Sequence, residues 1–346
     1  MSYLDEKKIE KNQSLNFMKA IACLSVIALH CPIPGWFGKL YYGFARFAVP
    51  FFFMISGYFV YKEDNKNIRL RLQKKIKHII KLLLISEIIY FIWHIIQYYI
   101  LYGIEGSIGW FISLFTFSNL IKLLIFQSTM IGDVSWFLIA LLLCYIVTFI
   151  IAKNDLWNIS AKLSTILLVV NVILGEITPF YGVSVQWYWC SNFWLLGFPF
   201  YSFGYWISIH KHTLCKKFSN IDLCKILLIS MVVNILERIM TDGSQFFLSN
   251  AFIAFSIFMI CIKNPIISKT NIFKYIENIG EKYAVYVYIF HPIIRDILTI
   301  ITEIFNFSNT IMYQWIQPVL VFWCCIIIGS SFEVIKKLII HANYNY

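Results

Sequence analysis

Long apolar runs separated by short polar stretches dominate this sequence, and they predict an all-α protein built from membrane-spanning helices. Most runs hold close to the ~20 residues that cross a hydrocarbon core of ~30 Å as an α-helix. We expect a single membrane domain over residues 1–346, without a separate soluble domain. The ten predicted spans are residues 17–36, 44–61, 79–101, 135–152, 163–180, 193–209, 222–239, 246–262, 283–302 and 311–335.

The polar segments between these runs predict the orientation of the chain, because short loops rich in Lys and Arg stay in the cytoplasm. With both termini cytoplasmic, 24 of the 29 Lys and Arg residues lie on the inner side, and 29 − 24 = 5 lie elsewhere. We therefore expect an even number of spans. We also expect the first apolar helix to be retained as a signal anchor, since residues 1–13 are charged and polar and no cleavage site follows.

Two polar segments differ from simple loops. Residues 62–81 carry eight of the basic residues and predict a basic helix that enters the third span. Residues 103–134 form the longest predicted outer loop, and their apolar runs are interrupted by Ser, Asn and Lys122. Such a pattern is typical of an interfacial or re-entrant segment more than of a span.

Composition narrows the classes of function. The chain is 60% hydrophobic and 14% charged, with a mean hydropathy of +0.72, too apolar for a soluble protein of this length. The net charge of +11 belongs to loops that face anionic lipid headgroups, so nucleic-acid binding loses its main argument. The nine cysteines are scattered without a CxxC motif, so we predict neither a metal site nor a disulfide framework.

The first span carries two ionisable residues, Lys19 and His30. Ionisable side chains within a membrane helix are costly and mark functional sites by default. Eleven residues of helix place the two groups ~16 Å apart along the axis and roughly 20° apart around it. The spacing therefore predicts that Lys19 and His30 share one face of the helix, which is the first candidate for a site.

Several motifs add a resemblance to a known family. The strongest are Asn16-Phe-Met-Lys19 through His30-Cys-Pro32 and Arg46-Phe-Ala-Val-Pro50-Phe-Phe-Phe-Met-Ile-Ser56-Gly57-Tyr58. Weaker matches are the basic run Arg69–Lys81, Ser135-Trp136-Phe-Leu, Asn192-Phe-Trp-Leu-Leu-Gly-Phe-Pro199 through Gly204, and Tyr288-Ile-Phe-His291-Pro292. With these motifs in this order, the chain resembles the membrane acyltransferase-3 family, whose members transfer acyl groups, usually acetyl, to extracytoplasmic acceptors.

Two positions depart from the family pattern. Lys19 stands where the family more often has Arg, so a point charge replaces a bidentate fork. The basic run lacks the Arg-Arg doublet and the following Pro of many members. Both departures leave the fold prediction intact and weaken the residue-by-residue transfer of donor contacts.

His30 is the main catalytic candidate that the resemblance implies. Acyl transfer from a thioester to a hydroxyl needs a group that takes the acceptor's proton, and an imidazole titrates in the right range. His30 would act as general base or carry the acyl group transiently. The alternative interpretation is a histidine at the membrane boundary that is hydrogen-bonded to a neighbouring helix.

Basic residues supply the other main candidates. Arg46 lies at the outer start of the second span, where it would pair with an acidic residue, stabilise the negative charge on the thioester carbonyl, or hold a sugar hydroxyl. For acyl-coenzyme A, a polyanion, we predict contacts from basic side chains near the inner face. Two alternative roles compete with donor binding: Lys19 would snorkel to the headgroups, and the basic run Arg69–Lys81 would set topology and bind anionic lipid. The predicted donor-binding residues are Lys19, Arg69, Arg71 and Lys75.

Supporting roles are open for a further set of residues within the spans. Glu87 or Glu237 would orient His30 as a carboxylate behind an imidazole, and the sequence does not choose between them. His291 and Arg295 are helical neighbours at i and i+4, and helix bridging competes there with catalysis. For Ser56 and Tyr58, hydroxyls beside Gly57, we favour helix packing over a nucleophilic serine.

Together, the resemblance implies a multi-pass acyltransferase of the bacterial plasma membrane. It would move an acyl group, most often acetyl, from cytoplasmic acyl-coenzyme A to a hydroxyl of a cell-surface or envelope carbohydrate. Acetyl-coenzyme A would be a substrate, and no tightly bound cofactor is expected. Membrane lipid is a certain partner in this interpretation, and an extracytoplasmic partner protein or a homo-oligomer is left open.

Two other classes of function compete. An exporter or flippase of a polysaccharide or lipid-linked glycan also fits ten spans with inward-facing charges, but it needs no base at His30. A sensory or scaffold membrane domain is disfavoured, because 346 residues leave no attached soluble output domain.

Overall fold

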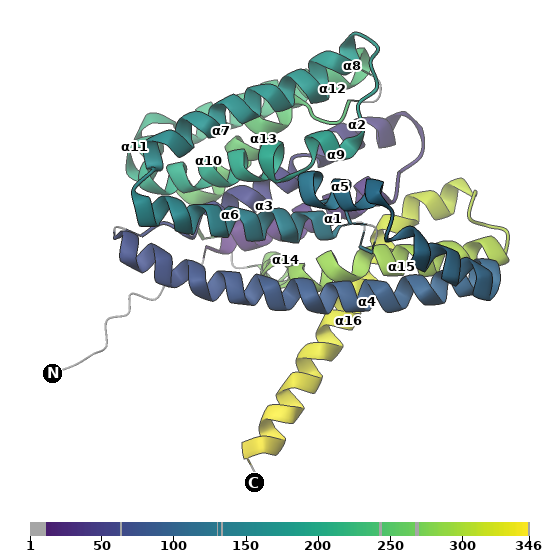
Figure 1. Cartoon of the computed structure of the whole chain (residues 1–346). Coiled ribbons are helices and arrows are strands. Elements are labelled where there is room, and N and C mark those ends of the chain that lie inside the picture. Colours follow the sequence, from purple (N-terminus) through teal and green to yellow (C-terminus); the bar gives the residue numbers. More distant parts are fainter. Residues whose placement is uncertain are drawn as a thin grey trace.

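Every secondary-structure element in the described part of the chain is a helix (Figure 1), as the apolar runs predict. The computed structural model describes residues 12–62, 64–129, 131–132, 134–241, 244–266 and 270–344, with side chains as far as residue 338. The two terminal residues themselves lie outside these ranges, and the cytoplasmic placement of both termini stays a prediction.

The helices follow the apolar runs closely, and two of them are short π-helical segments, η1 and η2. The elements in order are α1 (Gln13–His30), α2 (Gly35–Ala45), α3 (Ala48–Tyr58), α4 (Asn65–Ser113), α5 (Phe117–Phe126), α6 (Ser135–Asn154), α7 (Trp157–Val172), η1 (Ile173–Ile177), α8 (Thr178–Phe180), α9 (Trp187–Cys190), η2 (Phe193–Gly197), α10 (Phe198–Ile209), α11 (Lys211–Lys217), α12 (Asn220–Met240), α13 (Leu248–Lys263), α14 (Asn271–Lys282), α15 (Ala284–Ile304) and α16 (Ile311–Tyr344).

Within the described ranges, six helical stretches are long and apolar enough to cross a membrane. They are Gly35–Tyr58, Asn65–Ser113, Ser135–Asn154, Trp157–Phe180, Ala284–Ile304 and Ile311–Leu338. The other four predicted spans, in α1, η2 with α10, α12 and α13, are helical but fall outside those limits of length and composition. The protein is therefore a multi-pass membrane protein, while the total of ten spans stays a prediction.

The predicted outer connection over residues 103–134, expected to hold an interfacial or re-entrant segment, is helical for most of its length. Gly103 adopts a φ of 70° that interrupts α4. The helix then folds back, so that Ser107 donates a hydrogen bond to the Ile95 carbonyl (3.1 Å) and Trp110 packs against Phe91. Helix is favoured in apolar surroundings because it satisfies its own backbone groups.

Two other boundaries differ from the prediction. The second span begins earlier than expected, at the start of α2, and α3 continues it after a short turn. The segment between the eighth and ninth predicted spans contains α14, which packs along α1. Contact is close there, since a Cβ added at Gly280 would lie 1.8 Å from the Asn16 carbonyl oxygen. The predicted basic helix, by contrast, is confirmed as the first turns of α4.

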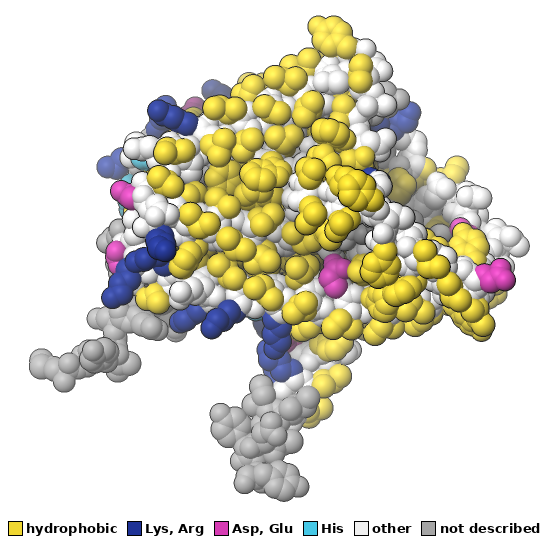
Figure 2. Space-filling view, in the orientation of Figure 1, with side chains coloured by type: hydrophobic (Ala, Val, Ile, Leu, Met, Phe, Trp, Pro, Cys, Tyr) yellow, Lys and Arg dark blue, Asp and Glu magenta, His cyan; other side chains and the backbone are white. Residues whose placement is uncertain are grey.

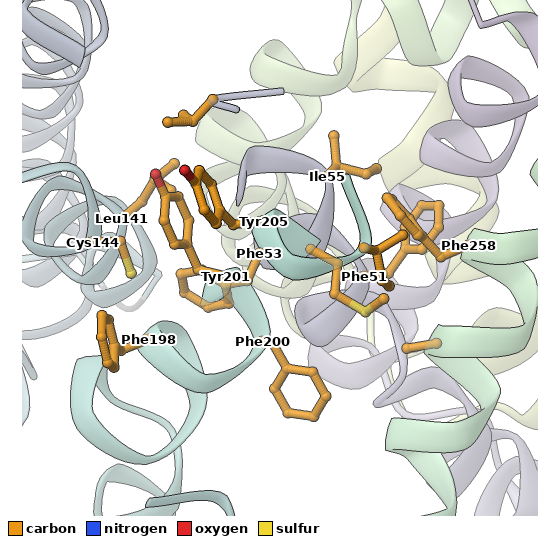
Figure 3. Packing of buried hydrophobic residues seen from close by; sticks show 14 of the residues in the cluster. Phe51, Phe53, Ile55, Leu141, Cys144, Phe198, Phe200, Tyr201, Tyr205 and Phe258 are labelled. Carbon is orange, nitrogen blue, oxygen red and sulfur yellow. The ribbon is translucent and has the colours of Figure 1, made fainter. Parts of the chain in front are cut away.

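The centre of the bundle is built from α3, α6, α10 and α13 (Figure 3), whose aromatic side chains pack together. The most extensive contact joins α3 with α10. Glycines make this approach possible: a Cβ added at Gly57 would lie 1.9 Å from the Tyr201 carbonyl oxygen, and one at Gly204 would lie 2.0 Å from that of Met54. The predicted packing role of Gly57 is confirmed.

The surface separates apolar from basic side chains. Figure 2 shows hydrophobic side chains over the middle of the visible face and Lys and Arg side chains mainly along its left and lower margins. In Figure 1 the left end is where α4 begins and where α11 lies. Such one-sided placement of cations is what the positive-inside rule describes.

Candidate active site

A cavity of about 1090 Å³ passes between the helices and receives side chains from much of the chain. One wall is α1, which contributes Lys19, Cys23, Val26 and His30. Their spacing of four, three and four residues follows a single helical face. Lys19 and His30 thus line the same cavity, as their spacing predicts.

His30 is the last residue of α1 and is partly exposed to the cavity. Its imidazole lies beside that of His291 on α15, with ring centroids 5.2 Å apart and ring planes inclined by 54°. His291 is fully buried and lines the same cavity. The structure therefore brings together two histidines that are separated by most of the chain.

The orientation of the His291 ring follows from the proline after it. Pro292 has no N–H, so the carbonyl of Tyr288 loses its helical donor. The Nδ1 atom of His291 replaces it, with hydrogen bonds of 2.9 Å to the carbonyls of Tyr288 and Val287. Carbonyl oxygens only accept, so Nδ1 carries the proton and Nε2 of the neutral ring keeps its lone pair.

Arg46 enters the cavity from the turn between α2 and α3. Its guanidinium donates to the Tyr42 hydroxyl (3.1 Å) and to the Gln245 carbonyl. It also lies over the rings of Tyr42 and Phe247, 4.9 and 5.8 Å from their centroids. Its described contacts include no acidic partner, so of the three predicted roles the ion pair is the one without support.

Lys19 lines the cavity from the first half of α1, whereas His30 ends that helix. Its ammonium group donates to the Asn16 side chain at 3.1 Å, and Glu281 of α14 is a charged neighbour that lines the same cavity. The side chain faces this space and does not lie along the lipid-facing surface. A snorkelling lysine would do the opposite.

The basic run contributes less to the cavity than predicted, since Arg69, Arg71 and Lys75 are not among its lining residues. Arg71 donates to the Phe59 carbonyl at the end of α3 (2.6 Å), and the ammonium group of Lys75 lies 5.3 Å from the centre of the Tyr145 ring. These side chains join α4 to its neighbours. One turn after Lys75, His78 does reach the cavity.

Ser56 and Tyr58, the two hydroxyl residues of the second motif, have different surroundings. Ser56 lines the cavity, and its hydroxyl donates to the Phe52 carbonyl one turn earlier (2.9 Å). Tyr58 packs edge to face against Phe59 and Phe258 in the core, with centroids 5.3 and 5.4 Å apart. Packing accounts for Tyr58, while Ser56 has access to the cavity.

The described contacts of the two predicted carboxylates, Glu237 and Glu87, are with serines and not with His30. Glu237 accepts hydrogen bonds from the backbone N–H and the hydroxyl of Ser249, at the start of α13. Glu87 lies near Ser135 and is absent from the cavity lining. A carboxylate at a helix N-terminus satisfies free N–H groups, which explains the position of Glu237.

Arg295 also has a structural partner. It forms an ion pair of 2.7 Å with Asp296, whose carboxylate in turn accepts a hydrogen bond from the Trp93 indole (3.2 Å). This arrangement ties α15 to α4. Arg295 therefore lies one turn beyond His291 and outside the cavity lining.

A comparison with protein families matches residues 12–330 to the acyltransferase-3 family, described as an acyltransferase domain. The chain belongs to the acyltransferase-3 family. The match covers both strong motifs and the three cavity histidines, His30, His78 and His291. Searches of curated proteins and of solved structures find no match. The protein is accordingly a membrane acyltransferase, and the cavity is its candidate active site.

Sequence reasoning assigned no role to several other side chains that line the cavity of this acyltransferase. Gln186, Gln245 and Tyr42 line the cavity, as do Trp136 and Trp187, whose ring centroids are 6.4 Å apart. The tryptophans had a signal in the sequence, since Trp136 stands at the start of a predicted span and Trp187 in an aromatic segment just before another. The two glutamines had none, because they lie in connections whose course only the folded chain defines.

The arrangement matches the needs of acyl transfer. It offers imidazoles for proton transfer, a guanidinium for negative charge on a carbonyl oxygen, and an ammonium group for an anionic donor. Across the described ranges, no three His, Cys, Asp or Glu side chains are placed to hold a metal ion.

Proposed function

We propose that this acyltransferase moves an acetyl group from cytoplasmic acetyl-coenzyme A to a hydroxyl of a cell-surface or envelope carbohydrate. The observation that carries the proposal is the shared cavity, which Lys19, His30 and Arg46 all line. A thioester and a hydroxyl that meet in this cavity can have the ammonium, the imidazole and the guanidinium within one space. Residence in a bacterial plasma membrane is part of the same proposal.

In the proposed reaction, the acceptor oxygen attacks the thioester carbonyl carbon while His30 takes the hydroxyl proton. The new C–O bond forms and the C–S bond breaks. His30 then returns the proton to the departing sulfur, which leaves as the free thiol of coenzyme A. Arg46 stabilises the negative charge on the carbonyl oxygen between these two steps.

The two ends of the cavity separate the two substrates. Lys19 would bind the anionic part of the donor, which exists only in the cytoplasm. Tyr42, Gln186 and the tryptophan pair would face the acceptor, because aromatic rings and amides suit the apolar faces and hydroxyls of a sugar.

The test uses purified protein in lipid with radiolabelled acetyl-coenzyme A and candidate envelope glycans. We expect His30→Ala to lower glycan labelling by about 10²- to 10⁴-fold, the usual contribution of a general base. The matched control is His94→Ala, another histidine within an apolar helix, which contacts Gln97 and does not line the cavity.

Equal labelling by wild type and His30→Ala would remove the proposed mechanism. An exporter without transferase activity would instead move glycan in both proteins and label it in neither.

A further inference from the structure

His30, the candidate general base, lies beside a second histidine that lines the same cavity. Glu87 and Glu237 have other contacts. The ionisable ring beside His30 is that of His291, 5.2 Å away between centroids.

His291 is held in one state by its own helix. The two carbonyls that Pro292 and the helix geometry present to Nδ1 fix the proton on that nitrogen. Nε2 is therefore an acceptor. It is fully buried and has no hydrogen-bond partner among the described residues.

An unpaired acceptor in a buried position is costly, and natural proteins retain few of them. This one belongs to a ring that lines the cavity next to the candidate general base. Hydrogen bonds of catalytic groups are often long or poorly aligned before substrate binds and tighten in the reacting complex. The geometry therefore indicates a donor that arrives during the reaction.

Charged and titratable groups near the pair come from several helices. On its own helix, Arg295 is one turn away and already paired with Asp296. On other elements, the charged or titratable residues that line the same cavity include Lys19 and Cys23 on α1, Tyr42 and Arg46 at α2, His78 on α4, Cys190 on α9 and Glu281 on α14, while Cys31 and Glu87 lie near α15. A second positive charge beside His30⁺ would oppose proton uptake, so a neutral neighbour suits a base.

We propose that His291 is the positioning residue of His30, which rests on the acyl transfer proposed above. In the reacting complex one ring N–H of His30 donates to Nε2 of His291. The other nitrogen of His30 then keeps its lone pair for the acceptor hydroxyl. When His30 takes the hydroxyl proton, the same hydrogen bond becomes charge-assisted and stabilises the imidazolium until the proton passes to the sulfur of coenzyme A.

Two substitutions separate positioning from packing. His291→Gln can place an amide oxygen near the position of Nε2 and so keeps an acceptor. His291→Asn reaches only the position of Nδ1, so it keeps the donor to the Tyr288 carbonyl and loses the acceptor. The matched control is His94→Asn. All four proteins are compared by transfer kinetics across the pH range in which an imidazole titrates, and by equilibrium binding of acetyl-coenzyme A.

We expect His291→Asn to lower kcat by about 10- to 100-fold, less than removal of the base itself. KM for acetyl-coenzyme A should change by less than about twofold, because the contacts that bind the donor lie elsewhere in the cavity. The acidic limb of its pH profile should move to lower pH, because the charged form of His30 loses a hydrogen bond. His291→Gln should keep most of the activity and the wild-type profile.

Equal losses in both His291 variants with an unchanged pH profile would assign a packing role and overturn the proposal. Wild-type kinetics in His291→Asn would overturn it as well. The proposed function fails separately, by absence of glycan labelling in the wild type or by full labelling in His30→Ala.

Discussion

The crossing of α3 and α10 yields a quantitative prediction for Gly57→Ala. The added Cβ would lie 1.9 Å from the Tyr201 carbonyl oxygen, whereas ordinary contacts begin at 3.4 Å. The two helices would have to separate by 3.4 − 1.9 = 1.5 Å. Backbone atoms cannot rotate away as a side chain can, so the cost should reach the upper part of the ~1–3 kcal/mol typical of overpacking.

The same displacement should lower activity, because α3 also carries Ser56 and Phe52 into the cavity wall. A shift of about 1 Å in a site can cost 10²-fold in rate, so we expect kcat to fall by about 10- to 100-fold. Stability would be measured by denaturant titration in detergent micelles, and activity by acetyl transfer in lipid.

Gly109→Ala is the matched control, since Gly109 is also helical and nothing lies within 4 Å of an added Cβ. It should leave activity unchanged and stabilise its helix by up to ~1 kcal/mol. The double variant Gly57→Ala/Gly204→Ala should cost less than the sum of its parts, because one separation of the helices accommodates both methyl groups. Wild-type stability of Gly57→Ala, or full additivity, would refute this account of the crossing.

Two further predictions concern the cations of the site. Lys19→Ala should raise KM for acetyl-coenzyme A by about tenfold with little change in kcat. Lys75→Ala should leave KM within about twofold, because the Lys75 ammonium group lies over the Tyr145 ring outside the cavity. Equal effects of the two substitutions in steady-state kinetics would contradict the assignment. Arg46→Gln should lower kcat by about 10²-fold, because it removes the positive charge at the carbonyl oxygen. Arg46→Lys should keep only part of the wild-type kcat, because one ammonium group cannot reach both the Tyr42 hydroxyl and the Gln245 carbonyl. A wild-type kcat in Arg46→Lys would show that the forked geometry of the guanidinium is unimportant.

Some of this site could be predicted from the sequence because helical periodicity is local. A separation of eleven positions between Lys19 and His30 is enough to predict a shared face, and both side chains do line one cavity. Gly57 likewise signals a close approach before its partner is known. The apolar runs also predict the helices themselves, since a chain in lipid has to satisfy its backbone within each segment.

Other features depend on how the helices are rotated against each other, which local periodicity does not determine. Arg71 and Lys75 lie in the predicted basic helix, yet this helix turns them toward Phe59 and Tyr145. Residue spacing does not indicate a partner for Glu237, but in the folded chain Glu237 accepts a hydrogen bond from the Ser249 backbone at the start of α13. The π-helical segment Phe193–Gly197 shifts the register of the helix that follows, which residue spacing alone does not anticipate.

The charge balance of the cavity connects these assignments to the chemistry. By formal charge, with histidine counted as neutral, the described lining residues Lys19, Arg46 and Glu281 give a net charge of 2 − 1 = +1. A positive site favours the anionic donor and the negative charge that forms on the carbonyl oxygen, but it disfavours protonation of His30. A neutral acceptor beside His30 reconciles the two demands, because it stabilises the imidazolium without adding negative charge that would repel the oxyanion. A carboxylate in the place of His291 would strengthen the base and weaken the site for the intermediate.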